Sequence, residues 1–191
     1  MTTFQPVIKW SGSKRSQAKK IIEFFPDEID IYYEPFVGGG AIIKRLLSSD
    51  IKVNRYICSD INNDLIALWN LIKSNPKIVA DTYEEMWREL NMNEDVKRKK
   101  QYFYMVRERF NKYKNPLDFM FIMRTTTNGM PRYNLKGEFN NSFHITRNGI
   151  KPETLRKIIT DWTEVLNKYN VEFICQDYFN VTTQLNDFLY L

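Results

Sequence analysis

Hydrophobic and polar positions in the first 75 residues alternate between helix-like and strand-like spacing. Apolar residues over 14–25 recur at roughly helical spacing, and Pro26 follows them as a stop signal. The expected elements of this part are a helix over 14–25, a strand over 31–37, a helix that starts at Ala41, a strand over 55–59 and a helix over 61–72. This order predicts the opening of a doubly wound parallel sheet.

The rest of the chain has a different pattern. Residues 80–125 are predominantly helix-like, whereas residues 125–150 are rich in turn signals around a short β-like stretch. Helical spacing resumes at Pro152, which suits the first position of a helix, and runs to about Tyr169. Two apolar runs come after it, over 171–175 and 188–191.

We therefore expect an α/β fold, with a Rossmann-like doubly wound sheet and one inserted segment. The sheet would be built from residues 1–75 and 170–191, and residues 76–169 would form a helical, loop-rich insertion. The length of 191 residues suits about one domain, and the 43% hydrophobic and 15% aromatic content is typical of a folded chain. Since there is no long uncharged apolar run and the N-terminus lacks a signal-peptide layout, we expect a cytoplasmic protein without a membrane span.

The two cysteines lie inside apolar, strand-like runs. A lone thiol in such a run usually behaves as a small buried hydrophobic group. We therefore expect Cys58 and Cys175 to be buried, and we expect neither a disulfide nor a bound metal.

The net charge of +5 is unevenly distributed. Between Lys97 and Lys157 there are 15 Lys or Arg against four acids, which gives +11, while the rest of the chain sums to −6. A basic region of this kind is typical of a surface that neutralises nucleic-acid phosphates. The alternative interpretation is a solvated helical face. Aromatic residues interleave with the basic ones over 102–114, and at this spacing they are expected to be core, with the charges on the other face.

A glycine turn between the first strand and the next helix is the first candidate for chemistry: Glu34-Pro35-Phe36-Val37-Gly38-Gly39-Gly40-Ala41. Glycines in such a turn allow positive φ and close approach of a ligand to the backbone. Asp60 ends the next strand, where a carboxylate commonly accepts the two ribose hydroxyls of a nucleoside. Asp60 as a cap of the following helix is the alternative, and the two roles are compatible.

A third segment lies near the N-terminus and reads Lys9-Trp10-Ser11-Gly12-Ser13-Lys14. Taken alone, Trp10 could be core and Lys14 helix surface. The three segments together, in order and spacing, resemble Dam-type (D12 class) adenine-specific DNA methyltransferases. That family carries Lys-Trp-x-Gly-x-Lys, then Glu-Pro-Phe-x-Gly-x-Gly, then Ser/Ala-Asp-Ile-Asn.

Two further segments extend the resemblance over nearly the whole chain. Arg132-Tyr133-Asn134, followed by Gly137 and Phe139-Asn140, looks like the signature of the family's target-recognition region. Gln176-Asp177-Tyr178 lies where the family's adenine-contacting acid and aromatic are found. The resemblance implies the fold of S-adenosylmethionine-dependent methyltransferases and a DNA-recognition insertion.

The resemblance also implies a cofactor, S-adenosyl-L-methionine, and assigns residues to it. Trp10 and Lys14 would contact the cofactor, the loop from Phe36 through Gly38 to Gly40 would pass under its methionine half, and Asp60 would hold its ribose. Asp177 would face the adenine amino group, with Tyr178 or Ile61 against the ring.

On the DNA side, the resemblance implies a surface for double-stranded DNA. Its residues would be Lys9, Asn128, Arg132, Asn134, Lys136, Asn140 and His144. Arg132 is the natural candidate for a bidentate contact to a guanine, whereas Lys136 and the helix around Lys97–Lys100 suit phosphates. His144 is interpreted as a loop residue and not as a catalytic base or metal ligand. We expect a monomer.

The chain departs from the family pattern in two places. Thr125-Thr126-Thr127 precedes Asn128, where relatives often have an aromatic wedge, and threonine fills an emptied base position poorly. The 191 residues also contain no Asp-Pro-Pro-Tyr, which in the family grips the flipped adenine, so no catalytic residue is assigned. We expect a fragment of a longer methyltransferase with this motif directly after Leu191; a truncated, non-catalytic protein that binds S-adenosylmethionine and DNA is the alternative.

Other classes predict different properties. An RNA or small-molecule methyltransferase would bind the cofactor without salt-sensitive affinity for a duplex. A dinucleotide-dependent oxidoreductase is disfavoured because the turn is not G-x-G-x-x-G. The sequence leaves open the DNA word, although many relatives read GATC, and whether a restriction enzyme accompanies the protein.

Overall fold

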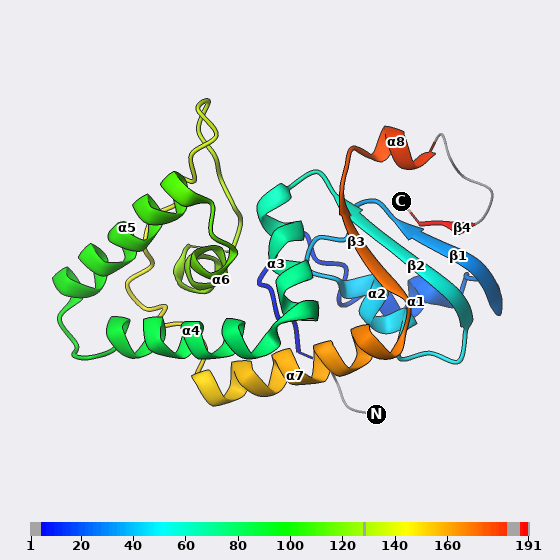
Figure 1. Cartoon of the computed structure of the whole chain (residues 1–191), viewed down its shortest axis with the longest axis horizontal. Helices are drawn as coiled ribbons and strands as arrows, with labels where there is room; N and C mark the ends of the chain where they lie inside the picture. The colour runs from blue at the N-terminus through cyan, green and yellow to red at the C-terminus, as the bar shows by residue number, and fades with distance from the viewer. Residues whose placement is uncertain (1–4, 128, 183–187, 191) are drawn as a thin grey trace.

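A parallel sheet forms the centre of one half of the molecule (Figure 1). The computed structural model describes residues 5–127, 129–182 and 188–190. The strands are β1 (Glu28–Glu34), β2 (Lys52–Asp60), β3 (Val171–Cys175) and β4 (Phe188–Leu189), in the spatial order β3-β2-β1-β4. Each neighbouring pair in this order is parallel, which confirms the predicted mixed α/β fold.

The register of the strands brings several polar residues to one edge of the sheet. Glu34 at the end of β1 pairs with Cys58, and Asp60 at the end of β2 pairs with Cys175 of β3. Because the carboxyl ends of parallel strands meet at one edge, Glu34 and Asp60 both face the crevice where α/β sheets bind ligands.

The helices are α1 (Ala18–Ile22), α2 (Ala41–Leu46), α3 (Asn63–Ser74), α4 (Pro76–Leu90), α5 (Val96–Tyr113), α6 (Pro116–Thr125), α7 (Pro152–Lys168) and α8 (Tyr178–Thr182). Figure 1 shows α4, α5 and α6 on the side of the molecule away from the strands, with α3 between α6 and the sheet. The helical part is thus joined to the sheet through α3, against which α7 also packs.

Short polar residues begin the helices at the positions that local chemistry favours. The side-chain oxygens of Asn62, Asn75 and Asn115 accept backbone N–H groups at the starts of α3, α4 and α6. Proline follows the cap in α4 and α6, where its missing N–H costs nothing. These caps explain why the helical pattern is broken into separate helices.

The order of the predicted elements is confirmed, but several boundaries differ. The second strand spans Lys52–Asp60 where 55–59 was expected, and the next helix spans Asn63–Ser74 where 61–72 was expected. The first strand was expected over 31–37 and lies at Glu28–Glu34, because the chain turns at Pro35 and residues 35–40 form the glycine turn. The first helix was expected over 14–25 and is limited to Ala18–Ile22.

The core is built largely from aromatic and branched side chains. Trp69 of α3 stacks on Phe173 of β3 at a centroid distance of 5.0 Å and packs against Trp162 of α7 at 4.9 Å. Phe103 and Phe110 of α5 are fully buried, so the prediction that its aromatic stripe is core holds for them. The stripe ends at the exposed helix terminus, where Tyr113 is 64% exposed.

The turn-rich segment after α6 forms a hairpin-like loop. We name residues 126–144 the recognition loop, after the role that the motif resemblance predicts for them. Its isolated bridges are Thr126–Phe143 and Tyr133–Phe139, so the predicted β-like stretch is minimal. Phe139 and Phe143 are buried against Phe110 and Phe103 of α5, at centroid distances of 6.0 and 5.4 Å. The base of the recognition loop is therefore attached to the helical part through its own aromatic residues.

The prediction that both cysteines are buried is confirmed for Cys58 and wrong for Cys175. Both thiols are free, and Cys58 is fully buried inside β2. Cys175 is exposed because the last two residues of β3 are not covered by packing, as the burial along the strand shows. Over the residues that the structure describes, no helix is long and apolar enough to cross a bilayer.

Candidate cofactor pocket and nucleic-acid interface

A cavity of about 390 Å³ lies at the carboxyl edge of β1 and β2. Its volume is within the usual range for small-molecule sites. It is lined by residues 10–14, Glu34, 36–39, Ala41, Ile42, Asp60 and Tyr190. The structure thus brings together the N-terminal motif, the glycine turn and the acid of the second strand, which are far apart in the sequence.

The glycine turn requires glycine for conformation and for space. Gly38 has φ +47, and a Cβ there would lie 2.8 Å from Cδ1 of Trp10. Gly40 has φ +70, and a Cβ there would lie 3.0 Å from the rings of both Trp69 and Trp162. The indole N–H of Trp69 donates to the Gly38 carbonyl at 2.9 Å. The turn is therefore held by the hydrophobic core beneath it, and its upper side borders the cavity.

Asp60 is bonded to this turn directly. Its Oδ2 accepts the Gly38 N–H at 3.2 Å, and its Oδ1 accepts the Asn62 N–H at 3.0 Å. Burial raises the pKa of the Asp60 carboxyl above its usual value, and these N–H groups oppose the rise. A carboxylate has about four acceptor sites, so capacity remains for two ligand hydroxyls. The cap of α3 is Asn62 and not Asp60, since Asn62 Oδ1 accepts the Leu65 N–H at 2.9 Å.

Glu34 is a pocket residue to which the sequence analysis gave no role. It is only 3% exposed, and its Oε2 accepts the Tyr32 hydroxyl and the Ile43 N–H, each at 3.1 Å. Burial raises the pKa of Glu34 to about 8. Its position as the first residue of the glycine motif could have indicated from sequence that Glu34 lines the pocket. Tyr190 also lines the cavity, but it belongs to none of the motifs found in the sequence.

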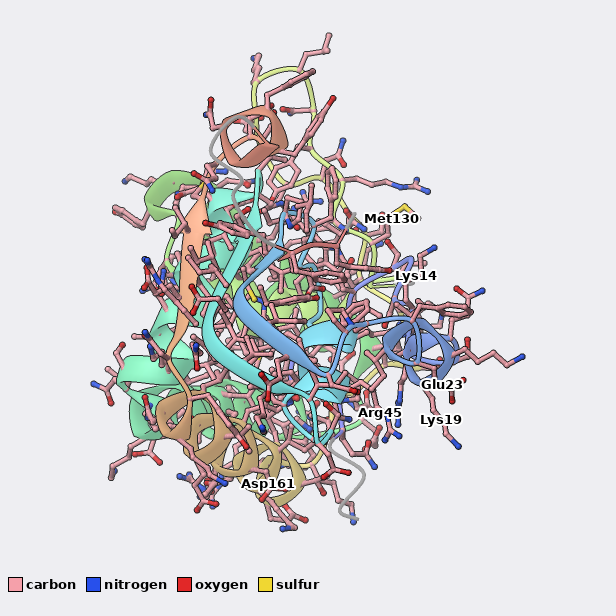
Figure 2. All side chains as sticks on the ribbon, turned by 90° about the vertical axis from the view of Figure 1, so that its right-hand side faces the viewer. Lys14, Lys19, Glu23, Arg45, Met130 and Asp161 are labelled. Atoms are coloured by element: carbon pink, nitrogen blue, oxygen red, sulfur yellow. The ribbon has the colours of Figure 1, made fainter. Side chains whose placement is uncertain are left out.

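The other predicted cofactor residues lie at the pocket or beside it. Trp10 and Lys14 line the cavity, Trp10 half-buried against the glycine turn and Lys14 exposed. Figure 2 shows Lys14 on the same side of the molecule as Met130 of the recognition loop. Phe36 also lines the cavity and is exposed.

Ile61, Asp177 and Tyr178 lie outside the cavity lining. The ring of Tyr178 is 5.5 Å from that of Phe36, and Ile61 is exposed next to Asp60. Together, Phe36, Ile61 and Tyr178 leave apolar surface open at this end of the sheet. Asp177 Oδ1 accepts the Phe179 N–H at 3.0 Å, so this carboxylate also begins α8.

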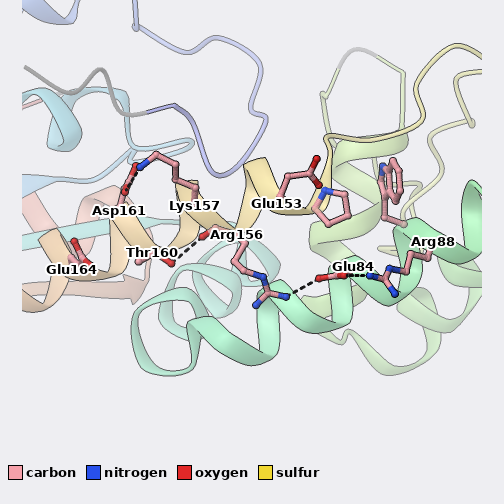
Figure 3. A pocket seen from close by; sticks show the side chains of 10 residues that line it. Glu84, Arg88, Glu153, Arg156, Lys157, Thr160, Asp161 and Glu164 are labelled. Atoms are coloured by element: carbon pink, nitrogen blue, oxygen red, sulfur yellow. Dashed lines mark hydrogen bonds and ion pairs between the residues drawn. The ribbon is translucent and has the colours of Figure 1, made fainter.

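A larger hollow of about 650 Å³ lies between α4 and α7 (Figure 3). Its charged side chains bond to one another: Arg156 to Glu84 at 2.9 Å and Lys157 to Asp161 at 3.4 Å. It includes neither a strand end nor a glycine turn. We therefore take the smaller cavity at the sheet edge as the candidate ligand site.

The predicted DNA residues lie around the recognition loop. The side chain of Lys9 packs against the loop at Gly129, since a Cβ at Gly129 would be 2.6 Å from Cγ of Lys9. Arg132, Lys136 and Asn140 are exposed. Asn128 lies outside the described residues.

Two asparagines hold the recognition loop together internally. Asn134 Oδ1 accepts the N–H groups of Lys136 and Glu138 at 2.9 and 3.0 Å, so this predicted DNA residue is bonded within its own turn. Asn141 was not predicted; it is buried, accepts the Arg132 N–H at 2.7 Å and donates to the Met130 carbonyl.

His144 is half-buried at the end of the recognition loop. Its Nδ1 lies 3.1 Å from the Thr146 hydroxyl oxygen, and its backbone N–H donates to the Thr125 carbonyl. Among the described residues, no three His, Cys, Asp or Glu side chains form a group suited to a metal ion.

The basic residues at the start of α5 differ in burial and pairing, and the burial of Lys99 contradicts its predicted place in a phosphate-contacting run over Lys97–Lys100. Lys99 is buried, and its Nζ donates to Glu94 Oε2 at 2.9 Å and to Asn148 Oδ1 at 3.4 Å. Arg98 is paired with Glu89. Lys97 and Lys100 are exposed and can meet a partner.

A parallel sheet with a glycine turn after one strand and an acid at the end of the next is the arrangement in which many α/β proteins bind a nucleoside. The model of the D12 class N6 adenine-specific DNA methyltransferases matches residues 10–191, and the chain belongs to this family. The resemblance drawn from the motifs is thereby confirmed.

Individual relatives agree with this family. The chain is 36% identical over 148 residues to the Type II methyltransferase M.MjaIII of Methanocaldococcus jannaschii, a match that covers 71% of this chain and 50% of the relative. It is 35% identical over 153 residues to a DNA adenine methylase of Haemophilus influenzae, covering 78% and 50%. For a DNA adenine methylase of Escherichia coli K12 the values are 32% over 184 residues, covering 94% and 60%. The chain spans about half the length of the curated relatives it matches.

Proposed function

We propose that this chain carries the cofactor-binding and target-reading parts of a site-specific DNA adenine-N6 methyltransferase that uses S-adenosyl-L-methionine. The observation that carries the proposal is the Asp60 carboxylate, bonded to the Gly38 N–H at the edge of a cavity of suitable size. The family match and the printed names of the relatives as adenine methylases support the reaction class. The site of action would be DNA in the cytoplasm.

The residues at the sheet edge suit the parts of this cofactor. Asp60 retains acceptor sites for the two ribose hydroxyls, and the Phe36–Gly40 turn offers close approach to the methionine half. Trp10 and Lys14 would close the pocket from the N-terminal side. The open apolar surface of Phe36, Ile61 and Tyr178 suits an adenine ring, and Asp177 lies beside it as an acceptor for the amino group.

The exposed basic residues suit a duplex. Arg132 has the planar fork that matches a guanine edge, Lys136 is exposed on the same loop, and the half-buried Lys9 lies against Gly129 of that loop. Lys97 and Lys100 add charge that suits phosphates. Asn140 and His144 would border this surface, and Asn134 would act by shaping the turn that carries Lys136.

Bound S-adenosyl-L-methionine would supply an electrophilic methyl group. The residues assigned here bind and orient: they hold the ribose and place the DNA. The family's Asp-Pro-Pro-Tyr does not occur in these 191 residues, so we assign no group to the adenine amine itself.

Equilibrium dialysis with labelled S-adenosyl-L-methionine tests the cofactor site. Asp60→Asn should weaken binding at least about tenfold, which is about 1.4 kcal/mol, because an amide replaces one acceptor oxygen with a donor. Asp50→Asn is the matched control, since Asp50 is exposed and lies outside the cavity. Equal affinity of the two variants for S-adenosyl-L-methionine would show that Asp60 does not bind the cofactor.

A methyl-transfer assay on adenine-containing duplex DNA tests the reaction. Label in N6-methyladenine supports the proposed activity. Binding of both ligands without label by the whole protein would instead support a non-catalytic protein that binds S-adenosylmethionine and DNA.

A further inference from the structure

Tyr133 attaches the recognition loop to the start of α3. Its hydroxyl donates to Asp64 Oδ2 at 2.8 Å and accepts from Asn62 Nδ2 at 3.4 Å. Its ring packs edge-on against Phe139, with centroids 5.8 Å apart. Burial raises the pKa of Tyr133, and the carboxylate of Asp64 raises it further, so the hydroxyl keeps its proton and remains a donor.

Asn62 continues this attachment into the candidate cofactor pocket. Its backbone N–H donates to Asp60 Oδ1 at 3.0 Å, while its side-chain oxygen caps α3. The other oxygen of Asp60 accepts the Gly38 N–H. Hydrogen bonds therefore run without interruption from Gly38 through Asp60 and Asn62 to Tyr133.

Tyr133 lies between two exposed residues of the recognition loop, Arg132 and Asn134. The Arg132 N–H donates to Asn141 Oδ1 at 2.7 Å, and its carbonyl accepts the Asn140 N–H at 2.9 Å. These bonds fix Arg132 within the loop, whereas the Tyr133 hydroxyl fixes this part of the loop relative to α3. The position of the Arg132 guanidinium relative to the cofactor pocket thus depends on Tyr133.

We propose that Tyr133 is a positioning residue that couples occupation of the Asp60 pocket to the placement of the DNA-reading loop. A ribose held by Asp60 would restrict the carboxylate, and through Asn62 it would hold the Tyr133 hydroxyl and Arg132 in one arrangement. Because such coupling is reciprocal, DNA on the loop would tighten cofactor binding by the same factor. This inference rests on the proposed function.

Hydrogen exchange of the 191-residue chain, with and without S-adenosyl-L-homocysteine as a non-reacting probe, tests the coupling without requiring turnover. In the native protein, saturation should slow exchange at least about fivefold in both the glycine turn and residues 129–144. In Tyr133→Phe the glycine turn should be slowed as before, and the slowing over 129–144 should fall below about twofold.

Tyr113→Phe is the matched control, because Tyr113 is an exposed tyrosine at the end of α5 and should behave as the native protein. Asp64→Asn is the second variant; it keeps the size of the Tyr133 partner and should reduce the slowing in the same direction. Should Tyr133→Phe unfold, this variant decides the question.

Three results would contradict the proposal. Full slowing over 129–144 in both Tyr133→Phe and Asp64→Asn would overturn the coupling role. Slowing of the glycine turn alone in the native protein would also overturn it while leaving the proposed function intact. Slowing in neither segment would remove the proposed cofactor site and the inference together.

A second readout uses affinity for a GATC-containing duplex. The factor by which S-adenosyl-L-homocysteine strengthens DNA binding should approach one in Tyr133→Phe and remain at its native value in Tyr113→Phe. A merely structural role of Tyr133 would weaken DNA binding equally with and without the probe, and that result would contradict the proposal.

Discussion

Gly129 of the recognition loop lies directly under the side chain of Lys9, so close that a Cβ on Gly129 would be 2.6 Å from Cγ of Lys9. Lys9 immediately precedes Trp10, which lines the candidate cofactor pocket. Arg124, at the end of α6, adds to this contact by donating to the Pro6 carbonyl at 2.7 Å. The N-terminal segment therefore connects the pocket to the loop that we assign to DNA.

Gly129→Ala should test that contact. Gly129 has φ +60, and the new methyl group would also displace Lys9, so we expect a loss of about 2–3 kcal/mol in the free energy of unfolding. Gly137→Ala is the control, because φ is +73 there but nothing lies within 4 Å, and only the backbone strain of about 1–2 kcal/mol applies. Urea denaturation measures both, and equal losses in the free energy of unfolding would mean that Lys9 moves away from the new methyl group without loss of stability.

Glu34 should make stability depend on pH. Its pKa is raised from 4.5 to about 8, so the neutral form is favoured in the folded protein. The contribution of neutral Glu34 to the free energy of unfolding is complete below about pH 4.5 and is lost as pH rises toward 8. The free energy of unfolding then falls by up to about 1.4 kcal/mol per pH unit. Glu34→Gln should therefore become more stable relative to the native protein between pH 5 and pH 8. Parallel urea-midpoint profiles for the two proteins would contradict this prediction.

Lys99 and Lys100 are neighbours on α5 with opposite expected effects. Lys99→Ala removes a buried side chain that joins Glu94 and Asn148, and it should lower the free energy of unfolding by about 2 kcal/mol. Lys100→Ala changes an exposed residue, so it should leave stability within about 0.5 kcal/mol of the native value. It should instead reduce the salt dependence of DNA binding by about one ion. Thermal melts and a salt titration separate the two effects, and reversed roles would show that the basic face is assigned to the wrong residues.

Arg132→Ala and Lys136→Ala should distinguish base reading from phosphate contact. Loss of a bidentate guanine contact costs about 1–3 kcal/mol and relaxes sequence preference. Loss of a phosphate contact weakens all sequences about equally. Competition binding with a set of duplexes that differ at one base pair measures both. An equal loss of affinity for all duplexes in Arg132→Ala would show that Arg132 contacts a phosphate and not a base.

Much of the fold follows from local chemistry. Asparagine caps followed by proline, as at Asn75 and Asn115, break the middle of the chain into separate helices, and these residues act within one turn. The glycine turn and Asp60 were also found from sequence, because the conformation of Gly38 and the end of a strand are local properties. The prediction for Cys175 was wrong because its burial depends on which helices cover the end of β3.

The sequence by itself therefore determined the order of elements, the glycine turn and the motif resemblance, since spacing and turn chemistry act over a few residues. Only the tertiary structure decided which polar groups meet. Tyr133 and Asp64 are 69 positions apart, and Lys99 and Asn148 are 49 apart. Contacts at such separations depend on how whole helices pack. That packing buries Glu34 and Lys99 and brings the Tyr133 hydroxyl to Asn62 and Asp64.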